Sequence, residues 1–215
     1  GFCPFFLSVF PFGTIAFSIR MSKVTRRECR EVLFQCLYSA AFNRDESLDA
    51  FLHTFFHSPR FITLLSDSYF LEMYSGVRAK SSELSRLVAH FAPKFDLPLI
   101  SIANLLSVYI ASYEMLYLSP ELRPDTRISI NEGIGLSKTF CDESNKRLTY
   151  GVLHSISADL DASRAIALNT TITTRDIYSE DLVAESAQIA SVRLEDAFLA
   201  PTQKQLDRAS RRAFD

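Results

Sequence analysis

Apolar side chains recur every three or four residues along most of this chain, and polar side chains fill the positions between them. That period is typical of α-helices that bury one face and expose the other. It predicts helices over residues 24–42, 48–56, 68–92, 99–117, 128–140 and 146–156. The pattern therefore predicts an all-α protein, with the unusually apolar segment 99–117 at its centre.

The first predicted helix begins with a sequence that caps it. Thr25 is followed three residues later by Glu28, and such a pair forms a capping box, in which each side chain accepts from the other residue's backbone N–H. Positive charge gathers at the same end, although the net charge of the whole chain is -2. Any basic surface must therefore be local. The cations at this end are Lys23, Arg26, Arg27 and Arg30.

Arginine and tyrosine side chains along this helix suit an RNA strand. A guanidinium can clamp a phosphate with two hydrogen bonds or stack on a base, and an exposed tyrosine ring offers a platform for a base. Helical spacing places Tyr38 on the same side as Arg27, Glu31 and Gln35. The alternative interpretation is a solvated, arginine-rich helix end with a half-buried tyrosine.

A second basic pair follows an acidic turn between the last two predicted helices. Three residues of the turn can cap the second of these helices through their side-chain oxygens: Asp142, Ser144 and Asn145. Lys146 and Arg147 come next, in a first helical turn where the helix dipole disfavours positive charge. Free backbone amides with two cations make an anion site, and phosphate is the usual anion. The alternative is a pair of solvated surface charges.

Three motifs resemble the NusB-type family of transcription antitermination factors. The family's RR.ARE...Q.LY is matched at Arg26, Arg27, Arg30, Glu31, Gln35, Leu37 and Tyr38. Its AYELLY resembles residues 113–117, Tyr-Glu-Met-Leu-Tyr. Its INEAVELAK.F and S.KFVNGVLD resemble residues 130–153, with Ile130-Asn131-Glu132 and Gly151-Val152-Leu153 in place. The resemblance covers residues 24–158, with the motifs in the right order and spacing.

The chain departs from the family pattern at four positions that bear on structure or binding. Gly133 and Gly135 stand where the family has good helix formers. Leu148 replaces a phenylalanine that could stack on a base, and Tyr109 stands where a family arginine is expected to make a surface contact.

The resemblance implies a helical bundle of about seven helices, made of two packed three-helix-type subbundles, to which this chain adds a C-terminal helical extension. It also implies a non-catalytic RNA-binding factor that recognises box A RNA in nascent ribosomal RNA leaders. A small-subunit ribosomal protein would bind on the 68–92 helix and on the exposed side of the 99–117 helix. RNA polymerase would be an indirect partner, and a homodimer is possible. The expected RNA-binding residues are Lys23, Arg26, Arg27, Arg30, Gln35, Tyr38, Lys146 and Arg147.

Two other classes of protein are alternatives to an RNA-binding factor. The same helical module precedes the catalytic domain of ribosomal RNA cytosine methyltransferases, but that domain needs a Gly-rich cofactor loop and no glycine follows Gly151. Glu114 and Glu132 have no neighbouring nucleophile or metal ligand, so we interpret them as groups that tie helices together. The remaining class is a structural scaffold whose basic residues are incidental.

Cysteine and histidine spacing indicates neither a cofactor nor a metal. His53 and His57 are four residues apart, but no third ligand is near them in sequence, so we expect packed or surface histidines. The cysteines have no CxxC spacing, which favours a reducing compartment, the cytoplasm. They are Cys3, Cys29, Cys36 and Cys141.

Both ends of the chain differ from its middle. Residues 1–20 are apolar, but proline and glycine interrupt them and the run is short for a membrane span. We favour an upstream mis-assigned start there over a signal or an anchor. The helical domain is expected over 21–160, followed by 161–215. We expect a linker at 163–176 and a helix at 180–199 that folds back on the bundle.

Overall fold

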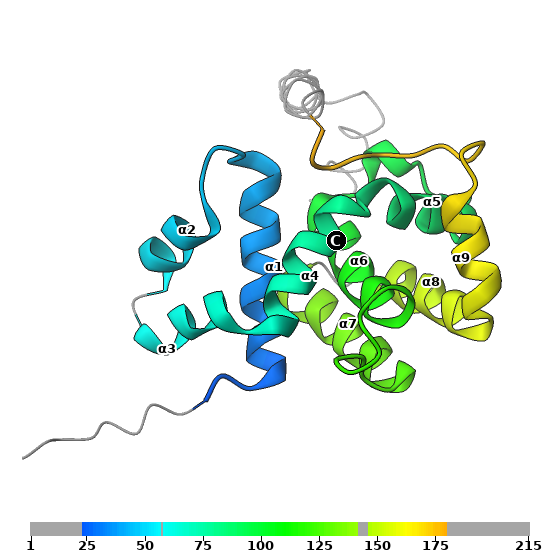
Figure 1. Cartoon of the computed structure of the whole chain (residues 1–215). Helices are drawn as coiled ribbons and strands as arrows, with labels where there is room; N and C mark the ends of the chain where they lie inside the picture. The colour runs from blue at the N-terminus through cyan, green and yellow to red at the C-terminus, as the bar shows by residue number, and fades with distance from the viewer. Residues whose placement is uncertain (1–22, 57, 142–145, 180–215) are drawn as a thin grey trace, which may run out of the picture.

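The structure is a computed structural model that describes residues 23–56, 58–141 and 146–179. Within these ranges every regular element is a helix, so the predicted all-α class is confirmed (Figure 1). The main helices are α1 (Arg26–Phe42), α4 (Ser68–Ala79), α5 (Ser81–Phe91), α6 (Ile102–Leu116), α7 (Thr126–Phe140), α8 (Lys146–Ala158) and α9 (Leu160–Leu168). The short elements are α2 (Leu48–Phe55), α3 (Pro59–Ile62) and the 3-10 turns η1 (Thr63–Ser66) and η2 (Leu97–Leu99).

Some of the sequence predictions lie outside the described residues. These are the apolar extension at 1–20, the helix at 180–199, the capping residues Asp142, Ser144 and Asn145, and His57. None of the helices within the described ranges has the length and apolarity that crossing a membrane would need.

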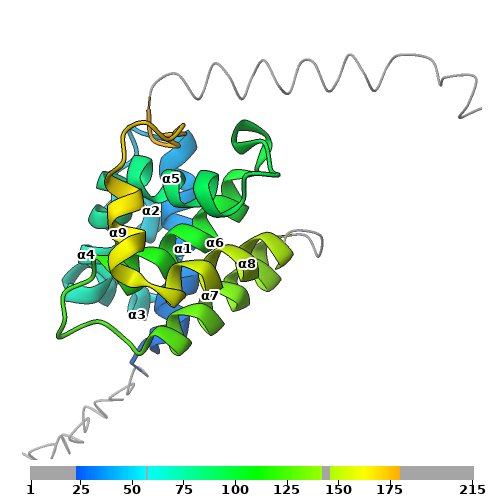
Figure 2. The same cartoon turned by 90° about the vertical axis from the view of Figure 1, so that its right-hand side faces the viewer.

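Helix α6 is the centre of the bundle, as its apolar composition predicts. It contacts α1, α4, α5, α7, α8 and α9, and Figures 1 and 2 show it enclosed by them. Every residue of α6 except Ala103 is buried. The expected binding of a partner protein on an exposed side of this helix is therefore wrong, because neighbouring helices cover it all round.

The predicted helix at 68–92 is two helices. The chain breaks at Lys80, between α4 and α5. Both halves bury their apolar stripe, but α4 packs on α1 and α6, whereas α5 packs on α6, α8 and α9. One straight helix could not reach both sets of neighbours. Glu83 stabilises the break, since its carboxylate lies 2.7 Å from Lys80 Nζ and accepts a 2.8 Å hydrogen bond from the Tyr117 hydroxyl.

The start of α1 confirms the capping box. The Thr25 hydroxyl accepts from the backbone N–H of Glu28, and a Glu28 carboxylate oxygen accepts from the backbone N–H of Thr25 at 2.9 Å. Both groups satisfy amides that have no partner within the helix. The helix and the chain direction leading into it are thus determined locally.

The segment that follows the family resemblance is part of the bundle. Residues 163–176, predicted as a linker, instead begin within α9, which packs on α5. The chain then stays attached, because Arg175 Nη1 donates a 2.5 Å hydrogen bond to the Ile100 carbonyl and the Tyr178 hydroxyl donates one of 3.2 Å to the Leu37 carbonyl. Ile177 is fully buried. Small side chains at many positions of α9 leave its sequence without a clear apolar period.

Candidate nucleic-acid interface

The three arginines at the start of α1 point in three directions. Consecutive helical residues are about 100° apart around the axis, so neighbours in sequence diverge in space. Arg27 projects towards α7 and is largely exposed. Arg26 lies over the Tyr69 ring, 3.9 Å from its centroid, and 3.8 Å from Asp67. Arg30 points into the interior. The sequence had suggested one continuous basic arm.

Arg30 is not available to bind RNA. It is 3% exposed, and its Nε donates a 2.7 Å hydrogen bond to Glu114 Oε1. Its Nη1 lies 3.7 Å from Glu132 Oε2, and the Tyr69 hydroxyl donates to the same Glu114 oxygen. The expectation that Glu114 and Glu132 tie helices together is confirmed. Arg30 is the group that they hold, and its burial contradicts its prediction as an RNA-binding residue.

Electrostatics keep this buried cluster in one protonation state. Burial and the negative charge of Glu114 raise the pKa of the Tyr69 hydroxyl far above its usual value, so it remains a hydrogen-bond donor. Burial alone would lower the pKa of Arg30. The negative charges of Glu114 and Glu132 oppose that effect, and the pKa of Arg30 is raised, which keeps the guanidinium charged.

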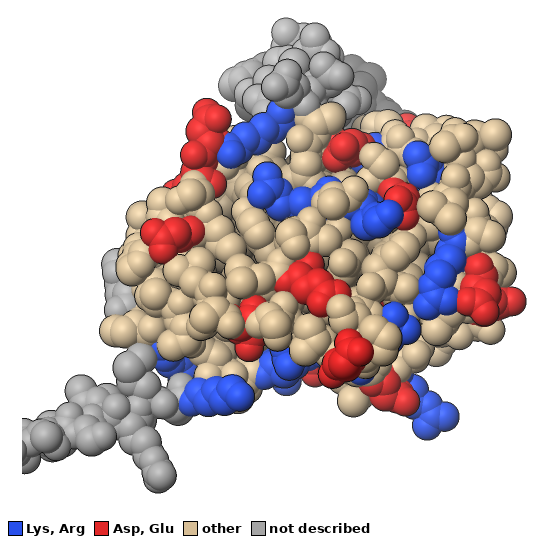
Figure 3. Space-filling model, in the orientation of Figure 1, with Lys and Arg blue, Asp and Glu red and all other residues tan. Residues whose placement is uncertain are grey.

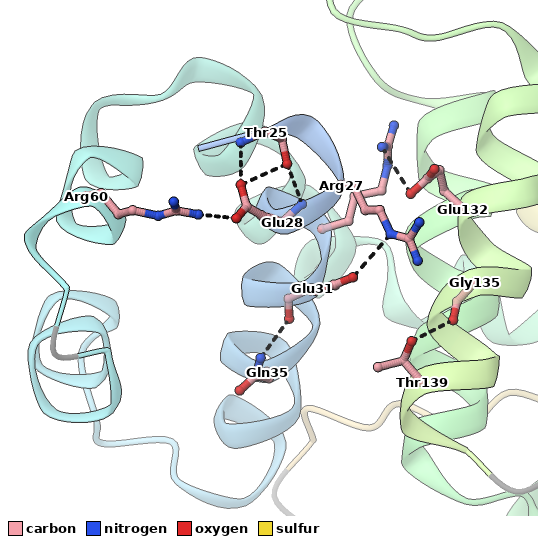
Figure 4. Close-up of polar contacts among 10 residues, drawn as sticks. Thr25, Arg27, Glu28, Glu31, Gln35, Arg60, Glu132, Gly135 and Thr139 are labelled. Carbon is pink, nitrogen blue, oxygen red and sulfur yellow. Dashed lines mark hydrogen bonds and ion pairs between the residues drawn. The ribbon is translucent and has the colours of Figure 1, made fainter. Parts of the chain in front are cut away.

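One face of α1 carries the exposed residues of the first motif. Figure 4 shows Arg27, Glu31 and Gln35 in succession along one side of α1, with Arg27 and Glu31 reaching towards α7. Tyr38 continues this face and is 42% exposed. Arg27 Nε lies 3.4 Å from Glu31 Oε1, but an exposed ion pair of this kind contributes only about 0.3–0.5 kcal/mol. A phosphate can therefore compete with Glu31 for this guanidinium.

Helix α7 lies beside this face and connects it with the second basic pair. The Phe34 and Phe140 rings stack at 4.3 Å, and Glu132 approaches Arg30 nearer the N-terminal ends of the same two helices. Helices α1 and α7 therefore run side by side in the same direction (Figure 4). Lys146 begins α8 six residues after Phe140. Those six residues span at most about 20 Å. The start of α8 therefore lies within that distance of Phe140, at the C-terminal end of α7.

Arg147 borders a pocket that the sequence did not indicate. The pocket, of about 210 Å³, lies between α8 and the end of α5, and Lys94 and Phe95 face Arg147 across it. Arg147 is exposed and Phe95 is 46% exposed. Lys94 adds a second cation here, and no family motif covers it. Only the fold brings it beside α8.

Two departures from the family pattern concern the core. Leu148 is 3% exposed and Tyr109 is fully buried. A base could not stack at position 148, and Tyr109 cannot make the surface contact of the family arginine, because α6 is enclosed. Burial raises the pKa of the Tyr109 hydroxyl well above its usual value. Both side chains fill space between helices.

The remaining predicted cations lie on the other flank of α1. Lys23 and Arg26 line a pocket of about 560 Å³ with Arg60 and the Thr63 and Ser66 side chains. Arg60 is also bound to the Glu28 carboxylate. On the face drawn in Figure 3, basic and acidic side chains are interspersed among uncharged ones, so no extended field of one sign covers it.

Of the two histidines at helical spacing, the structure describes His53. The His53 side chain is 58% exposed and lies 3.6 Å from Asp49 in the preceding helical turn. Among the described residues, no group of three histidine, cysteine or acidic side chains is arranged to hold a metal ion.

Comparison with known proteins agrees with this architecture. The sequence model of the NusB family matches residues 27–158, well over half of the chain. The chain belongs to the NusB family. The transcription antitermination protein NusB of Enterococcus faecalis is 27% identical over 154 residues, which cover 66% of this chain and 97% of that protein. NusB of Desulfovibrio desulfuricans is 26% identical over 145 residues, covering 64% and 87%.

A solved structure supports the fold. T. maritima NusB aligns with a TM-score of 0.51 at 23% sequence identity, over 64% of this chain and 94% of that one. The likeness shows a shared helical architecture. Both the α1 face and the start of α8 lie within the part that the NusB family covers, whereas all of α9 and the segment after it lie beyond residue 158.

Proposed function

We propose that this NusB-family protein is a non-catalytic transcription antitermination factor that binds box A-type RNA in nascent ribosomal RNA leaders. A small-subunit ribosomal protein acts with it, and the RNA polymerase elongation complex is the indirect target. The relatives named above are transcription antitermination proteins. Nascent RNA is the ligand, so the protein works where transcription occurs, in the cytoplasm.

The stacking of Phe34 on Phe140 is the observation that carries this proposal. It holds the end of α7 against α1, and α8 begins six residues after Phe140. An RNA strand needs such a sequence of cations and rings along one side of a protein. The contact therefore joins two motifs that are more than a hundred residues apart.

Each exposed residue has a role that its chemistry suits. Arg27, Lys146 and Arg147 bind phosphates, and the Tyr38 ring stacks on a base. Gln35 hydrogen-bonds a base edge with its amide. Lys23 and Arg26 extend the phosphate contacts round the start of α1, towards the α3 flank. Arg30 contributes indirectly, because its buried ion pairs hold α1 against α6 and α7.

The ribosomal protein binds on α4 and α5 in this proposal. Enclosure of α6 removes the other surface that the sequence suggested. Helix α4 keeps an outer side on which Leu71 is 38% exposed, and α9 covers part of α5. The outer side of α4 thus offers an uncovered apolar contact.

Titration of the full chain with fluorescently labelled RNA tests the proposal. The measurement is fluorescence anisotropy at one fixed salt concentration, with a box A leader RNA and with a scrambled RNA of the same length, each with and without the ribosomal protein. We expect tighter binding of the box A RNA and a further gain when the ribosomal protein is present. Equal, weak binding of both RNAs under all conditions would contradict the proposed function.

A further inference from the structure

Exposed aromatic side chains lie close together at the C-terminal end of α1. Tyr38, Phe42 and Phe55 are 42%, 46% and 60% exposed. They border one groove of about 520 Å³ between α1, α2 and the end of α7. Large apolar side chains that are exposed together on a folded protein usually mark a binding surface.

Rings form both the floor and the walls of this aromatic groove. The Phe34 and Phe140 pair, nearly parallel at 9°, lies at its base. On the α1 side Phe42 follows Tyr38 at 5.1 Å between ring centroids, and on the α2 side Phe55 stacks with a neighbouring phenylalanine at 4.4 Å. A planar guest can therefore meet aromatic surfaces from two helices.

None of the described residues that line the groove is charged, but two amides stand at its edge. The lining consists of Phe34, Gln35, Tyr38, Ser39, Phe42, Asn43, Phe51, Phe55, Ala103 and Phe140. Gln35 Nε2 donates to the Glu31 carbonyl at 3.3 Å, and Asn43 Nδ2 contacts the Ser39 hydroxyl at 3.2 Å. Their amide oxygens remain able to accept from the N–H groups of a base edge.

We propose that the aromatic groove binds unstacked bases of the RNA strand, next to the phosphate contacts of α1. This inference rests on the proposed function and extends it to Phe42, Phe55 and Asn43. Gln35 and Tyr38 belong both to the α1 face and to the groove, so the two surfaces are continuous. A base suits the lining, because it is neutral, planar and polar only at its edge.

Charge around the groove determines how the strand enters. Asp45, Glu46 and Asp49 follow α1 or lie at the start of α2, and they repel phosphates at that end. Lys138 is exposed in the last turn of α7, the helix whose end reaches the groove at Phe140. The RNA backbone therefore runs along the α7 side, and only the bases turn into the groove.

Two substitutions at position 55 distinguish a base from other ligands of the groove. Full-length Phe55→Tyr keeps an aromatic face, whereas Phe55→Leu keeps only an apolar side chain. The probe is box A RNA carrying 2-aminopurine at one position at a time, titrated at several salt concentrations. We expect quenching of the fluorescence at one or more positions, and affinity about 5- to 100-fold lower for Phe55→Leu than for Phe55→Tyr, since base stacking has that magnitude. The salt dependence should stay that of the unsubstituted protein, because no phosphate contact is lost.

The control is Leu168→Ala, which removes an apolar side chain that is 63% exposed on α9, outside the groove. It should leave RNA affinity unchanged. If RNA binds the unsubstituted protein and both Phe55 variants equally, the groove inference is wrong and the proposed function stands. If RNA binding is unchanged but Phe55→Leu weakens the binding of the ribosomal protein, the groove is a protein-binding site, which also overturns the inference. If the unsubstituted protein does not bind RNA, the proposed function itself fails.

Discussion

Arg30 Nε and Glu114 Oε1 are 2.7 Å apart in the interior, although the two residues are separated by 84 positions in sequence. One belongs to the arginine-rich start of α1 and the other to the central helix α6. Both side chains are almost inaccessible, at 4% and 1%. An arginine of the basic motif thus acts as a structural residue, and the motif combines an outward-facing part with an inward-facing part.

Removing Arg30 should destabilise the protein while removing Arg27 should not. Arg30→Met leaves the Glu114 charge buried without its strongest partner, and we expect a loss of about 3–5 kcal/mol in the free energy of unfolding. Arg27→Met, at an exposed position, should change it by less than about 0.5 kcal/mol. Urea denaturation followed by circular dichroism measures both. A double variant, Arg30→Met with Glu114→Leu, should recover part of the stability; equal stability of both single variants would contradict the buried role.

Charge reversal on the proposed RNA face should weaken binding strongly. Arg27→Glu with Arg147→Glu removes two phosphate contacts and adds repulsion, so RNA affinity should fall. The plot of the logarithm of the binding constant against the logarithm of the salt concentration should also become less steep, by about 0.7 per lost contact. Anisotropy titrations at four salt concentrations measure both quantities.

The matched control for charge reversal is Lys80→Glu. Lys80 lies at the turn between α4 and α5 and pairs with Glu83, away from α1 and α7. The same change in charge there should leave the salt slope unaltered. Unchanged affinity of the Arg27 and Arg147 double variant would favour a scaffold with incidental basic residues.

Two glycines in α7 should respond to alanine in opposite ways. A Cβ at position 133 would lie 2.7 Å from Ala111 Cβ and 2.8 Å from Leu153 Cδ1, so Gly133→Ala should destabilise the contact of α7 with α6 and α8. A Cβ at position 135 meets no atom within 4 Å. Gly135→Ala should stabilise the protein by about 0.5–1 kcal/mol, because alanine restricts the unfolded chain.

Thermal and urea denaturation compare the two glycine variants directly. They differ by two positions in one helix and carry the same chemical change, so each serves as the other's control. Similar effects of both substitutions would show that α7 does not pack as closely on its neighbours at position 133 as the distances indicate.

Alkaline pH should destabilise the fold through a buried thiol. Burial raises the pKa of Cys29 from an ordinary value near 9.0 to about 12. The folded state therefore keeps the proton while the unfolded state releases it above pH 9, so the stabilisation is complete below pH 9 and is lost as pH rises towards 12. The loss should approach about 1.4 kcal/mol per pH unit for this one group.

Urea denaturation between pH 8 and pH 11 measures the effect of the thiol. Cys29→Ala removes the titrating group, so its stability should decline less steeply with pH than that of the unsubstituted protein. Buried tyrosines such as Tyr69 contribute in the same direction and remain in both proteins. Identical slopes for the two proteins would show that Cys29 does not stay protonated in the folded state.

Sequence alone determined the elements that depend on local chemistry. The apolar period predicted the helices, and the Thr25 capping box located the start of α1. The motifs predicted the family, and the expected structural role of Glu114 and Glu132 is confirmed. Local patterns suffice here because a cap, a helical face and a motif each involve residues a few positions apart.

Only the tertiary structure decided which neighbour each face meets. It divided the arginines of α1 among an exposed face, a ring contact and the interior, broke one predicted helix at Lys80 and attached residues 160–179 to the bundle. A periodic pattern states which side of a helix is apolar, but not which helix covers it. Arg27 thus faces solvent, whereas Arg30, three positions along the helix, faces a buried carboxylate, because the packing involves residues far apart in the chain.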